Sequence, residues 1–415
     1  MIFRCYSIIY ELAYFFSGGL SYFIPKINRF LQQRSTIEAS IKAFSKKANH
    51  DIFWFHCASM GEFEQIKPLL EAIENELPRT QKIVTFFSES GYAIHKNSHL
   101  ADLVTYLPLD RKKDMMSFIN HIQPDALFLV KYEFWPNLIQ CCVRKKIRLY
   151  SISSTFRKEQ LFFKRFTLGM KSLLQQVDYF FVLNKDSKEQ LKNIHINQVE
   201  IIGDTRIDRV LNTAKNLNKH PQLDHFIDKN RCFIAGSTWP EDHQLFSSLP
   251  QLCQQTKWII APHKVDPSSI KKIENELTVP YTKWSTYEKS KDQNKRVLLL
   301  DCIGVLASAY SYANAAYVGG AMGKTGLHNI LEATAFGIPV IIGRNYKRYP
   351  EANDLIKLGG VKSVTSAQEF ELFYNTLKEK PLLEQQMGEI NKTYLESNKG
   401  ATSKIIYFLK THYNK

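Results

Sequence analysis

The chain has 415 residues, of which 44% are hydrophobic and 23% are charged, a composition that excludes a disordered or fibrous protein and allows two or three domains. Lys and Arg number 55 against 40 Asp and Glu, and this surplus of 15 favours a partner with negative charge: nucleic acid, an anionic membrane or a phosphorylated substrate. The seven cysteines are scattered without a C-x-x-C pair, which argues against a disulfide framework and a structural zinc site.

Residues 2–24 are apolar, and only Arg4 and Glu11 carry charge there. As a helix this segment would be about 35 Å long, enough to reach across a bilayer core. The Gly18–Gly19 pair and four tyrosines weaken the interpretation as a spanning helix, since Tyr and Phe suit the headgroup boundary as well as the interior. The basic residues that follow place the downstream chain on the cytoplasmic side. We therefore expect a membrane anchor or interfacial helix over residues 1–30. A core helix of the first domain ranks second, and a cleaved signal peptide third.

Apolar runs rich in Ile, Val and Phe recur along the rest of the chain, each followed by a longer mixed stretch. Such runs predict buried strands at 52–56, 82–87, 103–107, 126–130, 148–152, 179–183, 200–202, 232–235, 258–261, 297–300, 315–318 and 339–342. Helical stretches such as 62–76 and 329–336 lie between them. This alternation predicts parallel sheets with right-handed crossovers.

The polar segment 212–228 is the best candidate for a domain boundary. It gives an N-terminal domain of residues 31–211 and a C-terminal domain of residues 212–415, each a doubly wound, Rossmann-like α/β unit. Ligands of such units bind beyond the carboxyl ends of the strands. Two units that face each other would therefore enclose a cleft with two walls.

Three motifs of the first half follow predicted strands. Glu62, in A-S-M-G-E, opens a helix whose dipole would keep its carboxylate ionised as a proton acceptor, although a glutamate that merely complements the dipole is the simpler reading. Glu133, in K-Y-E-F-W-P-N, would lie at the cleft edge beside the apolar shelf of Trp135. The alternative is that Glu133 is only a charge at the strand end and that Trp135 only packs against the core. Arg206, in G-D-T-R-I-D, could reach a phosphate or simply pair with Asp208.

The segment 156–166 (FRKEQLFFKRF) interleaves aromatic and basic residues. With the basic residues at 144–148 it indicates a surface for phosphate groups beside acyl chains. Single-stranded nucleic acid and an ordinary amphipathic helix are the alternatives, and the apolar N-terminus favours lipid.

In the second half, Ser237 and Thr238 follow a strand in a turn that offers N–H groups to an anion, and Pro262-His263-Lys264 ends the next strand. The glycine-rich stretch 319–326 is not a P-loop, because Val318 stands where the first glycine is required. It leads to a helix whose start is a candidate anion site. Asn329 and Glu332 at that start could contact phosphate and ribose, or form an ordinary N-cap with a capping-box glutamate.

Together these motifs resemble the 3-deoxy-D-manno-octulosonic acid (Kdo) transferase family, in the family's order and over about residues 50–360. The resemblance rests on 58–62, 133–137, 203–208, 236–238 and 319–339. It implies an inverting glycosyltransferase of the two-domain GT-B fold. Such an enzyme moves Kdo from cytidine monophosphate (CMP)-Kdo to lipid IVA, a lipid A precursor, at the cytoplasmic side of the bacterial inner membrane. An apolar N-terminal anchor with a basic flank is also usual in the family.

Residue by residue, the resemblance implies Glu62 as the general base, with Glu133 and Arg206 supporting the transition state. The segments that match the holders of the CMP group contain Ser237, Thr238, Pro262, His263, Ile303, Gly304, Val305, Asn329, Ile330, Leu331 and Glu332. The chain departs from the family at Lys131, which replaces the first Glu of E-x-E-x-W-P-N. Arg206 stands where Lys is common. Pro262-His263-Lys264 and Ile303-Gly304-Val305 replace Pro-Arg-His and Met-Gly-Glu, and backbone groups can carry the contacts there.

The resemblance implies CMP-Kdo, lipid IVA and the anionic inner-membrane surface as partners, and no nucleic acid. No cofactor and no metal are expected, because a helix N-terminus and cationic side chains can stabilise a CMP leaving group. A GT-B-type nucleotide-sugar epimerase is one alternative, against which the anchor-like N-terminus speaks. A non-enzymatic peripheral membrane or nucleic-acid binding protein is the other, and Glu62 and Glu133 speak against it because carboxylates repel phosphate backbones.

Overall fold

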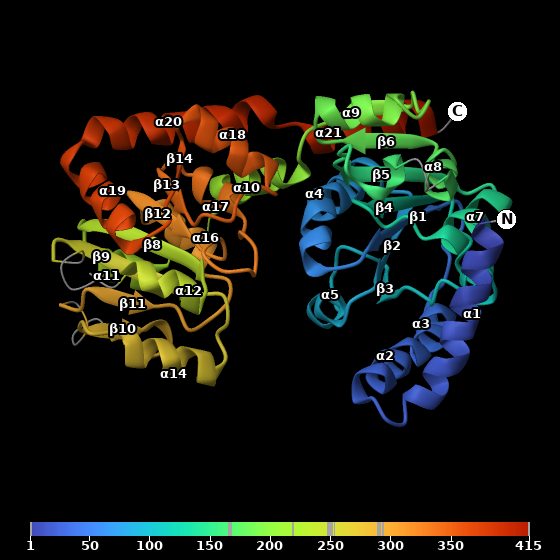
Figure 1. The fold of residues 1–415 in the computed structure, drawn as a ribbon, viewed down its shortest axis with the longest axis horizontal. Coiled ribbons are helices and arrows are strands. Elements are labelled where there is room, and N and C mark those ends of the chain that lie inside the picture. The colour runs from blue at the N-terminus through green and yellow to red at the C-terminus, as the bar shows by residue number, and fades with distance from the viewer. Residues whose placement is uncertain are drawn as a thin grey trace. The chain divides into compact units, whose positions relative to one another are not determined.

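The apolar runs of the sequence form the strands of two parallel sheets. The computed structural model describes residues 2–164, 168–217, 220–246, 252, 254–288, 292 and 294–413 (Figure 1). The chain divides into a first unit, which comprises the residues up to Asp208 and those from Lys399 onward, and a second unit, Arg209–Asn398. Each contains one seven-stranded sheet, so the prediction of two doubly wound α/β domains is confirmed.

The first sheet has the strand order β3-β2-β1-β4-β5-β6-β7, and all neighbours are parallel. Its strands are β1 (Asp51–Cys57), β2 (Thr80–Phe86), β3 (Leu103–Tyr106), β4 (Ala126–Val130), β5 (Arg148–Ser154), β6 (Tyr179–Val182) and β7 (Val199–Ile201). The central strand β4 is buried along its whole length, as a strand covered by helices on both faces must be. The order reverses between β1 and β4, which brings the carboxyl ends of these two strands together.

The helices of the first unit cover both faces of its sheet, on two separate apolar clusters. They are α1 (Ile2–Leu20), α2 (Pro25–Ser35), α3 (Ile37–Ala43), α4 (Met60–Glu76), α5 (Glu89–His95), α6 (Lys112–Ile122), α7 (Pro136–Arg144), α8 (Leu168–Leu174), α9 (Lys185–Lys192) and α21 (Ala401–Phe408). Helix α10 (Thr205–Lys215) begins in this unit, and its later residues belong to the second.

The C-terminal helix α21 belongs to the first unit, whereas the sequence places residues 399–415 with the second domain. Ile405, Ile406 and Phe408 of α21 join the apolar cluster beneath α4. Asp208 fixes the start of this helix, since its carboxylate accepts hydrogen bonds from the N–H groups of Gly400 (2.6 Å) and Thr402 (2.7 Å).

The second sheet has the order β10-β11-β9-β8-β12-β13-β14, again with parallel neighbours. Its strands are β8 (Arg231–Thr238), β9 (Thr256–Pro262), β10 (Tyr281–Lys283), β11 (Val297–Leu299), β12 (Ala315–Val318), β13 (Val340–Ile342) and β14 (Val361–Ser363). The helices are α11 (Pro221–Ile227), α12 (Pro240–His243), α14 (Pro267–Glu276), α16 (Leu306–Ala309), α17 (Ile330–Thr334), α18 (Pro350–Leu358), α19 (Ala367–Glu379) and α20 (Pro381–Asn398). The order reverses between β8 and β12, so the ends of β9, β8 and β12 share one edge.

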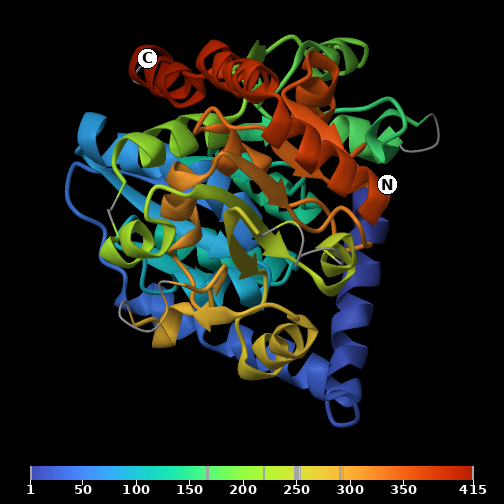
Figure 2. The same ribbon diagram turned by 90° about the vertical axis from the view of Figure 1, so that its left-hand side faces the viewer.

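The N-terminal helix α1 lies on the first unit with one face and exposes the other; it is the blue helix that descends from the N label in Figure 2. The hydroxyl groups of Tyr6 and Ser7 donate to Asp110 (2.9 Å) and to the side-chain oxygen of Asn137 (2.7 Å). Large apolar side chains are exposed on the other face: Ile8, Ile9, Leu12, Phe15 and Phe16. Among the described residues, no helix is both long enough and apolar enough to cross a bilayer.

The basic and aromatic segment 156–166 differs from its prediction as a lipid-facing surface. Phe156 is completely buried, and Phe162 and Phe163 pack against the same core cluster. The basic side chains Arg157 and Lys158 are exposed, as is Lys164, while Arg165 and Phe166 lie outside the described residues. The aromatic residues are therefore core residues, because alternation of aromatic and basic residues fits a half-buried segment as well as a membrane surface.

Candidate active site

Glu62 and Glu133 lie at the carboxyl edge of the first sheet, after the neighbouring strands β1 and β4. Glu62 is half-buried in the first turn of α4, where it accepts a hydrogen bond from the backbone N–H of Ala58. Burial and then the charge of Glu133 raise the pKa of Glu62 above its ordinary value, although the Ala58 N–H and the charge of Lys131 oppose this shift. The position of Glu62 at the helix start thus does not outweigh burial, and the higher pKa makes the carboxylate a stronger base.

Glu133 has the opposite shift. Burial alone would raise the pKa of Glu133, but an ion pair with His56 and a hydrogen bond from Trp135 outweigh burial and lower it. His56 Nε2 lies 3.4 Å from Oε2 of Glu133, and the indole Nε1–H of Trp135 donates to the same oxygen at 2.8 Å. Two nearby carboxylates with pKa values pushed apart are typical of sites that divide the work of acid and base.

Lys131, the main departure from the family motif, stands directly after β4 with a left-handed backbone (φ 58°). Its N–H donates to the carbonyl of Ile152 (3.0 Å), and its own carbonyl accepts from the hydroxyl of Ser154 (2.7 Å), which holds this conformation. The positive charge of Lys131 lowers the pKa values of Glu62 and Asp204. A cation therefore lies among carboxylates where the family motif has a further glutamate.

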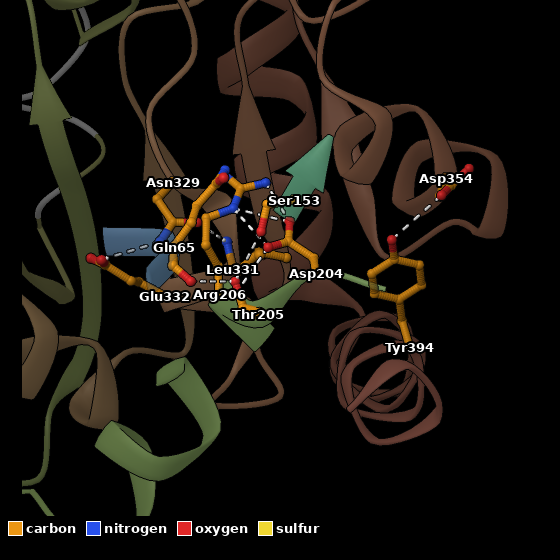
Figure 3. A network of polar contacts seen from close by, with 10 residues as sticks. All are labelled: Gln65, Ser153, Asp204, Thr205, Arg206, Asn329, Leu331, Glu332, Asp354 and Tyr394. Atoms are coloured by element: carbon orange, nitrogen blue, oxygen red, sulfur yellow. Dashed lines mark hydrogen bonds and ion pairs between the residues drawn. The ribbon is translucent and has the colours of Figure 1, made fainter. Parts of the chain in front are cut away.

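Arg206 pairs with Asp204, as Figure 3 shows. Its guanidinium donates two bonds to Oδ2 of Asp204, at 2.6 and 3.0 Å. Burial would raise the pKa of Asp204, but Arg206 outweighs it and lowers that pKa. The hydroxyl of Thr205 donates to the carbonyl of Gln65 on α4 (2.5 Å), so the turn that carries Arg206 contacts the helix whose first turn contains Glu62.

The side chains around Trp135 take different roles from those the motif suggests. Asn137 does not line the site: it is fully buried, and its amide donates to the carbonyl of Asp110 (2.5 Å). The apolar shelf beside Glu133 instead consists of Trp135 stacked on Phe87, with ring centres 5.0 Å apart. Arg34 extends this shelf, because its guanidinium also packs over the Phe87 ring, 4.8 Å from its centre.

In the second unit, the predicted donor residues all follow strands at the carboxyl edge of the second sheet. Ser237 has a left-handed backbone (φ 53°) at the end of β8, and Thr238 beside it is buried. Pro262 ends β9 and is buried, whereas His263 is exposed. These two strand ends are neighbours in the sheet.

The residues after β11 are arranged differently from those after β9. Ile303 is 87% exposed, Gly304 has a left-handed backbone (φ 97°), and Val305 is buried at the start of α16. Only backbone groups and the apolar side chain of Ile303 are thus available to a ligand at this turn.

Asn329 caps α17, where its side-chain oxygen accepts from the N–H of Leu331 (3.3 Å), and Ile330 and Leu331 are buried. The carboxylate of Glu332 accepts from the Asn329 amide at 3.2 Å (Figure 3). It also pairs with Arg209 at 2.8 Å. The N-cap interpretation of Asn329 is therefore confirmed. Glu332 does not complete a capping box with the backbone, as it is held by two side chains.

Sequence reasoning missed three residues that organise the second unit's edge. Asp242, which is fully buried, joins two loops, since its carboxylate accepts from the N–H groups of Trp239 and Gly320, both at 2.8 Å. The indole N–H of Trp239 donates to Nε2 of His328 (2.8 Å), and the ring of His263 stacks on both, with ring centres 4.7 and 4.4 Å away. A tryptophan beside histidines at strand ends is the one sequence signal that could have indicated this arrangement.

The hydrogen bond from Trp239 requires an unprotonated Nε2 on His328, and burial followed by the charge of His263 lowers the pKa of His328 to about 4. Because an unfolded histidine has a pKa of about 6.5, the unfolded chain binds more protons between these values, and stability falls as the pH drops. We expect His328 to destabilise the fold by about 2 kcal/mol between pH 7.5 and pH 5. Urea unfolding at both pH values checks this: His328→Gln should lose that increment, and His225→Gln on α11 should keep it.

No group of three or more His, Cys, Asp or Glu side chains suited to a metal ion occurs within the described ranges.

The chain is similar to known proteins in sequence and in fold. Residues 30–209 match the family model described as 3-deoxy-D-manno-octulosonic-acid transferase (kdotransferase). The chain is 26% identical over 373 residues to the 3-deoxy-D-manno-octulosonic acid transferase of Haemophilus influenzae, with 86% of each chain covered. It is 28% identical over 312 residues to a bifunctional glycosyltransferase/methyltransferase of Fusobacterium nucleatum, an alignment that covers 72% of this chain and 48% of that protein.

Among solved structures, the UDP-GlcNAc 2-epimerase of Neisseria meningitidis has a similar fold. The TM-score is 0.63 at 17% identity, over 87% of this chain and all of that one. This likeness concerns the fold alone. The family match over residues 30–209 and the relatives at 26–28% identity support the 3-deoxy-D-manno-octulosonic acid transferase family, and with it a glycosyltransferase.

Proposed function

We propose that the protein transfers Kdo from CMP-Kdo to lipid IVA, with inversion at the anomeric carbon, in lipopolysaccharide biosynthesis. One observation carries the proposal beyond the similarity to the family. At one edge of the first sheet, Glu62 has a raised pKa while its neighbour Glu133 has a lowered one. A base with elevated proton affinity beside a carboxylate that stays ionised is what attack by a hydroxyl on an electron-poor sugar carbon requires.

In the proposed reaction, Glu62 takes the proton of the acceptor's primary hydroxyl as that oxygen attacks the anomeric carbon of Kdo. The new C–O bond forms on the face opposite CMP, and the bond between the anomeric carbon and the CMP phosphate oxygen breaks with its electron pair leaving on CMP. The ionised Glu133 would stabilise positive charge that develops on the sugar ring. Arg206, with Asp204 holding its guanidinium, would face negative charge on the substrates.

The second unit would hold CMP. Ser237, Thr238, His263 and the turn from Asn329 to Glu332 lie at one edge of its sheet, where doubly wound units bind nucleotides. The proposed leaving group is a phosphate monoester dianion, which cationic side chains such as Lys264 and backbone N–H groups can stabilise. The proposed chemistry therefore needs no metal or cofactor.

Mass spectrometry of lipid IVA after incubation with the protein and CMP-Kdo tests the proposal. A mass increase by one or more Kdo units supports it. A parallel incubation with UDP-GlcNAc, followed by analysis of the sugar, tests the epimerase alternative that the fold also allows. An unmodified lipid IVA together with an epimerised sugar would replace the proposed function by that alternative.

We further propose that the protein works at the cytoplasmic face of the inner membrane, with the exposed side of α1 dipping into the headgroup region. A cavity of about 510 Å³ supports this, as it opens between α1 and α2 and is lined by Leu12, Phe15 and Leu31. Arg111 also lines it, with its guanidinium over the Tyr14 ring, 3.9 Å from the centre, and in an ion pair with Glu11. Apolar walls beside a cation suit the acyl chains and charged headgroups of a lipid acceptor.

Replacing Ile9, Phe15 and Phe16 together by Ser should weaken binding to anionic vesicles by at least about 100-fold. These side chains are 65, 77 and 61% exposed, and each apolar side chain withdrawn from water contributes about 1.5–3 kcal/mol when fully buried. Vesicle sedimentation measures the effect. The matched control is Leu372→Ser with Leu382→Ser in the second unit, whose side chains are 72 and 66% exposed. Equal binding of both variants would exclude α1 as the contact.

A further inference from the structure

His56 is the feature of the first unit that the proposed mechanism leaves unused. It is the sixth of the seven residues of β1, and its side chain is completely buried. Its Nδ1 is 3.1 Å from both the carbonyl oxygen and the hydroxyl oxygen of Thr85 on β2. Its Nε2 faces Oε2 of Glu133 at 3.4 Å and has no hydrogen bond of ordinary length to any described residue. A buried, polar atom left at this distance from one carboxylate calls for an explanation.

The surroundings of the ring determine where its protons lie. The carbonyl of Thr85 can only accept, and the Thr85 hydroxyl, which already accepts from the indole N–H of Trp54 (2.8 Å), can donate to Nδ1. Nδ1 is therefore satisfied in either protonation state. An unprotonated Nε2, however, would direct its lone pair at an ionised carboxylate. An N–H at Nε2 is the arrangement that turns this contact into an attraction.

The geometry of Glu133 shows what this attraction achieves. Trp135 donates to Oε2, the same oxygen that His56 faces, and no described residue donates to Oε1. The Glu133 side chain remains 16% exposed. One oxygen of the carboxylate is thus fixed from behind by two nitrogen atoms, and the other is left for a group that enters the site.

We propose that His56 is a positioning residue of the transfer reaction, which holds Glu133 ionised and in one orientation so that its Oε1 meets the reacting sugar. The inference rests on the proposed function, since it specifies how one carboxylate of that site is prepared. It does not make His56 a catalytic residue, because His56 is sealed from the site.

The charges around His56 explain why a residue is needed that keeps Glu133 ionised. Glu62 on α4, Asp110 before α6 and Glu133 are the carboxylates whose pKa values the charge of His56 lowers, and Lys131 is the neighbouring cation that acts on Glu62 and on the thiol of Cys57. Without His56, the pKa values of Glu62 and Glu133 would both rise, because the charge of His56 lowers both in this half-buried site. The site would then lose either its base or its ionised partner.

The test uses two substitutions in the full-length protein. His56→Leu removes both ring nitrogens, whereas His56→Gln keeps an N–H near the position of Nε2. We expect His56→Leu to lower kcat by about 10–100-fold, the range seen when a group that orients a reactive residue is removed, with KM for CMP-Kdo within twofold. Its acidic limb in the pH profile of kcat should move to higher pH. His56→Gln should recover most of kcat.

His95→Leu is the matched control. His95, on α5 in the same unit, also has a buried Nε2 without a partner among the described residues, and it stacks on Phe63 with ring centres 4.1 Å apart. It should change thermal stability without moving the pH profile. A His56→Leu enzyme with normal kcat and an unshifted acidic limb would overturn the proposal, as would an equal pH shift in His95→Leu.

A second measurement covers the case in which His56→Leu does not fold. The ¹⁵N resonances of the His56 ring, assigned by their absence in His56→Gln, should differ between the wild-type protein and Glu133→Gln, because the carboxylate no longer attracts the Nε2 proton. Identical ring resonances would overturn the proposal. This readout needs no substrate, so a protein that shows the coupling but transfers no Kdo contradicts the proposed function alone.

Discussion

Replacing Glu62 by Gln is expected to lower kcat for Kdo transfer by about 10²–10⁴-fold, the usual contribution of a general base. The amide keeps the size of the side chain but cannot accept the hydroxyl proton of the acceptor. Binding of CMP-Kdo should stay within about twofold, because the proposed nucleotide contacts belong to the second unit. Steady-state rates by mass spectrometry, with calorimetry of CMP binding, separate the two effects.

Glu71→Gln on the same helix is the matched control and should retain the wild-type rate. The wild-type rate should also fall as the pH drops through the pKa of Glu62, which burial and Glu133 place above the ordinary carboxylate value. Since only the ionised form accepts a proton, activity is present above this pKa and lost below it. A Glu62→Gln enzyme with a near-normal rate would show that another group removes the proton.

Most strands of both sheets follow from the sequence because parallel strands covered on both faces are continuous apolar runs. The sequence does not predict β10 and β14, the two edge strands of the second sheet. Each has three residues, and their sequences, Tyr281–Lys283 and Val361–Ser363, mix polar and apolar side chains. An edge strand buries less of its surface, so its sequence carries no continuous apolar signal.

The position of Glu62 and Glu133 at one edge of the sheet was foreseeable, because both follow strands and strand ends share an edge of the sheet. The roles within each motif were not. Asn137, the last residue of K-Y-E-F-W-P-N, serves the fold by donating to the carbonyl of Asp110. His56 contacts Glu133 from inside an apolar run that is typical of a buried core strand. Spacing in the sequence places a residue near an edge, but which partner it meets depends on a strand from elsewhere in the chain.

The C-terminal helix shows that the sequence also does not reveal which domain an element packs against. The apolar residues of α21 predict only that one face is buried, and they suit the second unit as well as the first. Asp208 accepts hydrogen bonds from the N–H groups of Gly400 and Thr402, which lie 192 and 194 residues further along the chain. No local pattern reports a contact of that separation, although the resulting helix covers the cluster beneath α4, which carries Glu62.

Asp242→Ala should lower the free energy of unfolding of the second unit by about 3–5 kcal/mol. The Asp242 carboxylate is fully buried and accepts three bonds: from the N–H groups of Trp239 and Gly320, and from the hydroxyl of Tyr317 at 2.6 Å. Removing it leaves three donors without their acceptor, at about 1–3 kcal/mol for each buried group, less what water recovers in the space left behind. Hydrogen exchange of β8 and β12 in urea measures the loss in this unit.

Asp224→Ala provides the matched control, because Asp224 also accepts from a tyrosine, Tyr312 at 2.8 Å, but at an exposed position. It should cost less than about 1 kcal/mol, since water replaces the lost partner there. The same carboxylate of Asp242 joins the turn of Ser237 and Thr238 to the glycine-rich loop before Asn329, so Asp242→Ala should also weaken CMP binding while the folded fraction is still high. If the two variants unfold at the same urea concentration, this carboxylate does not join the two loops, and the proposed CMP site must be organised by the stacked rings of Trp239, His263 and His328 instead.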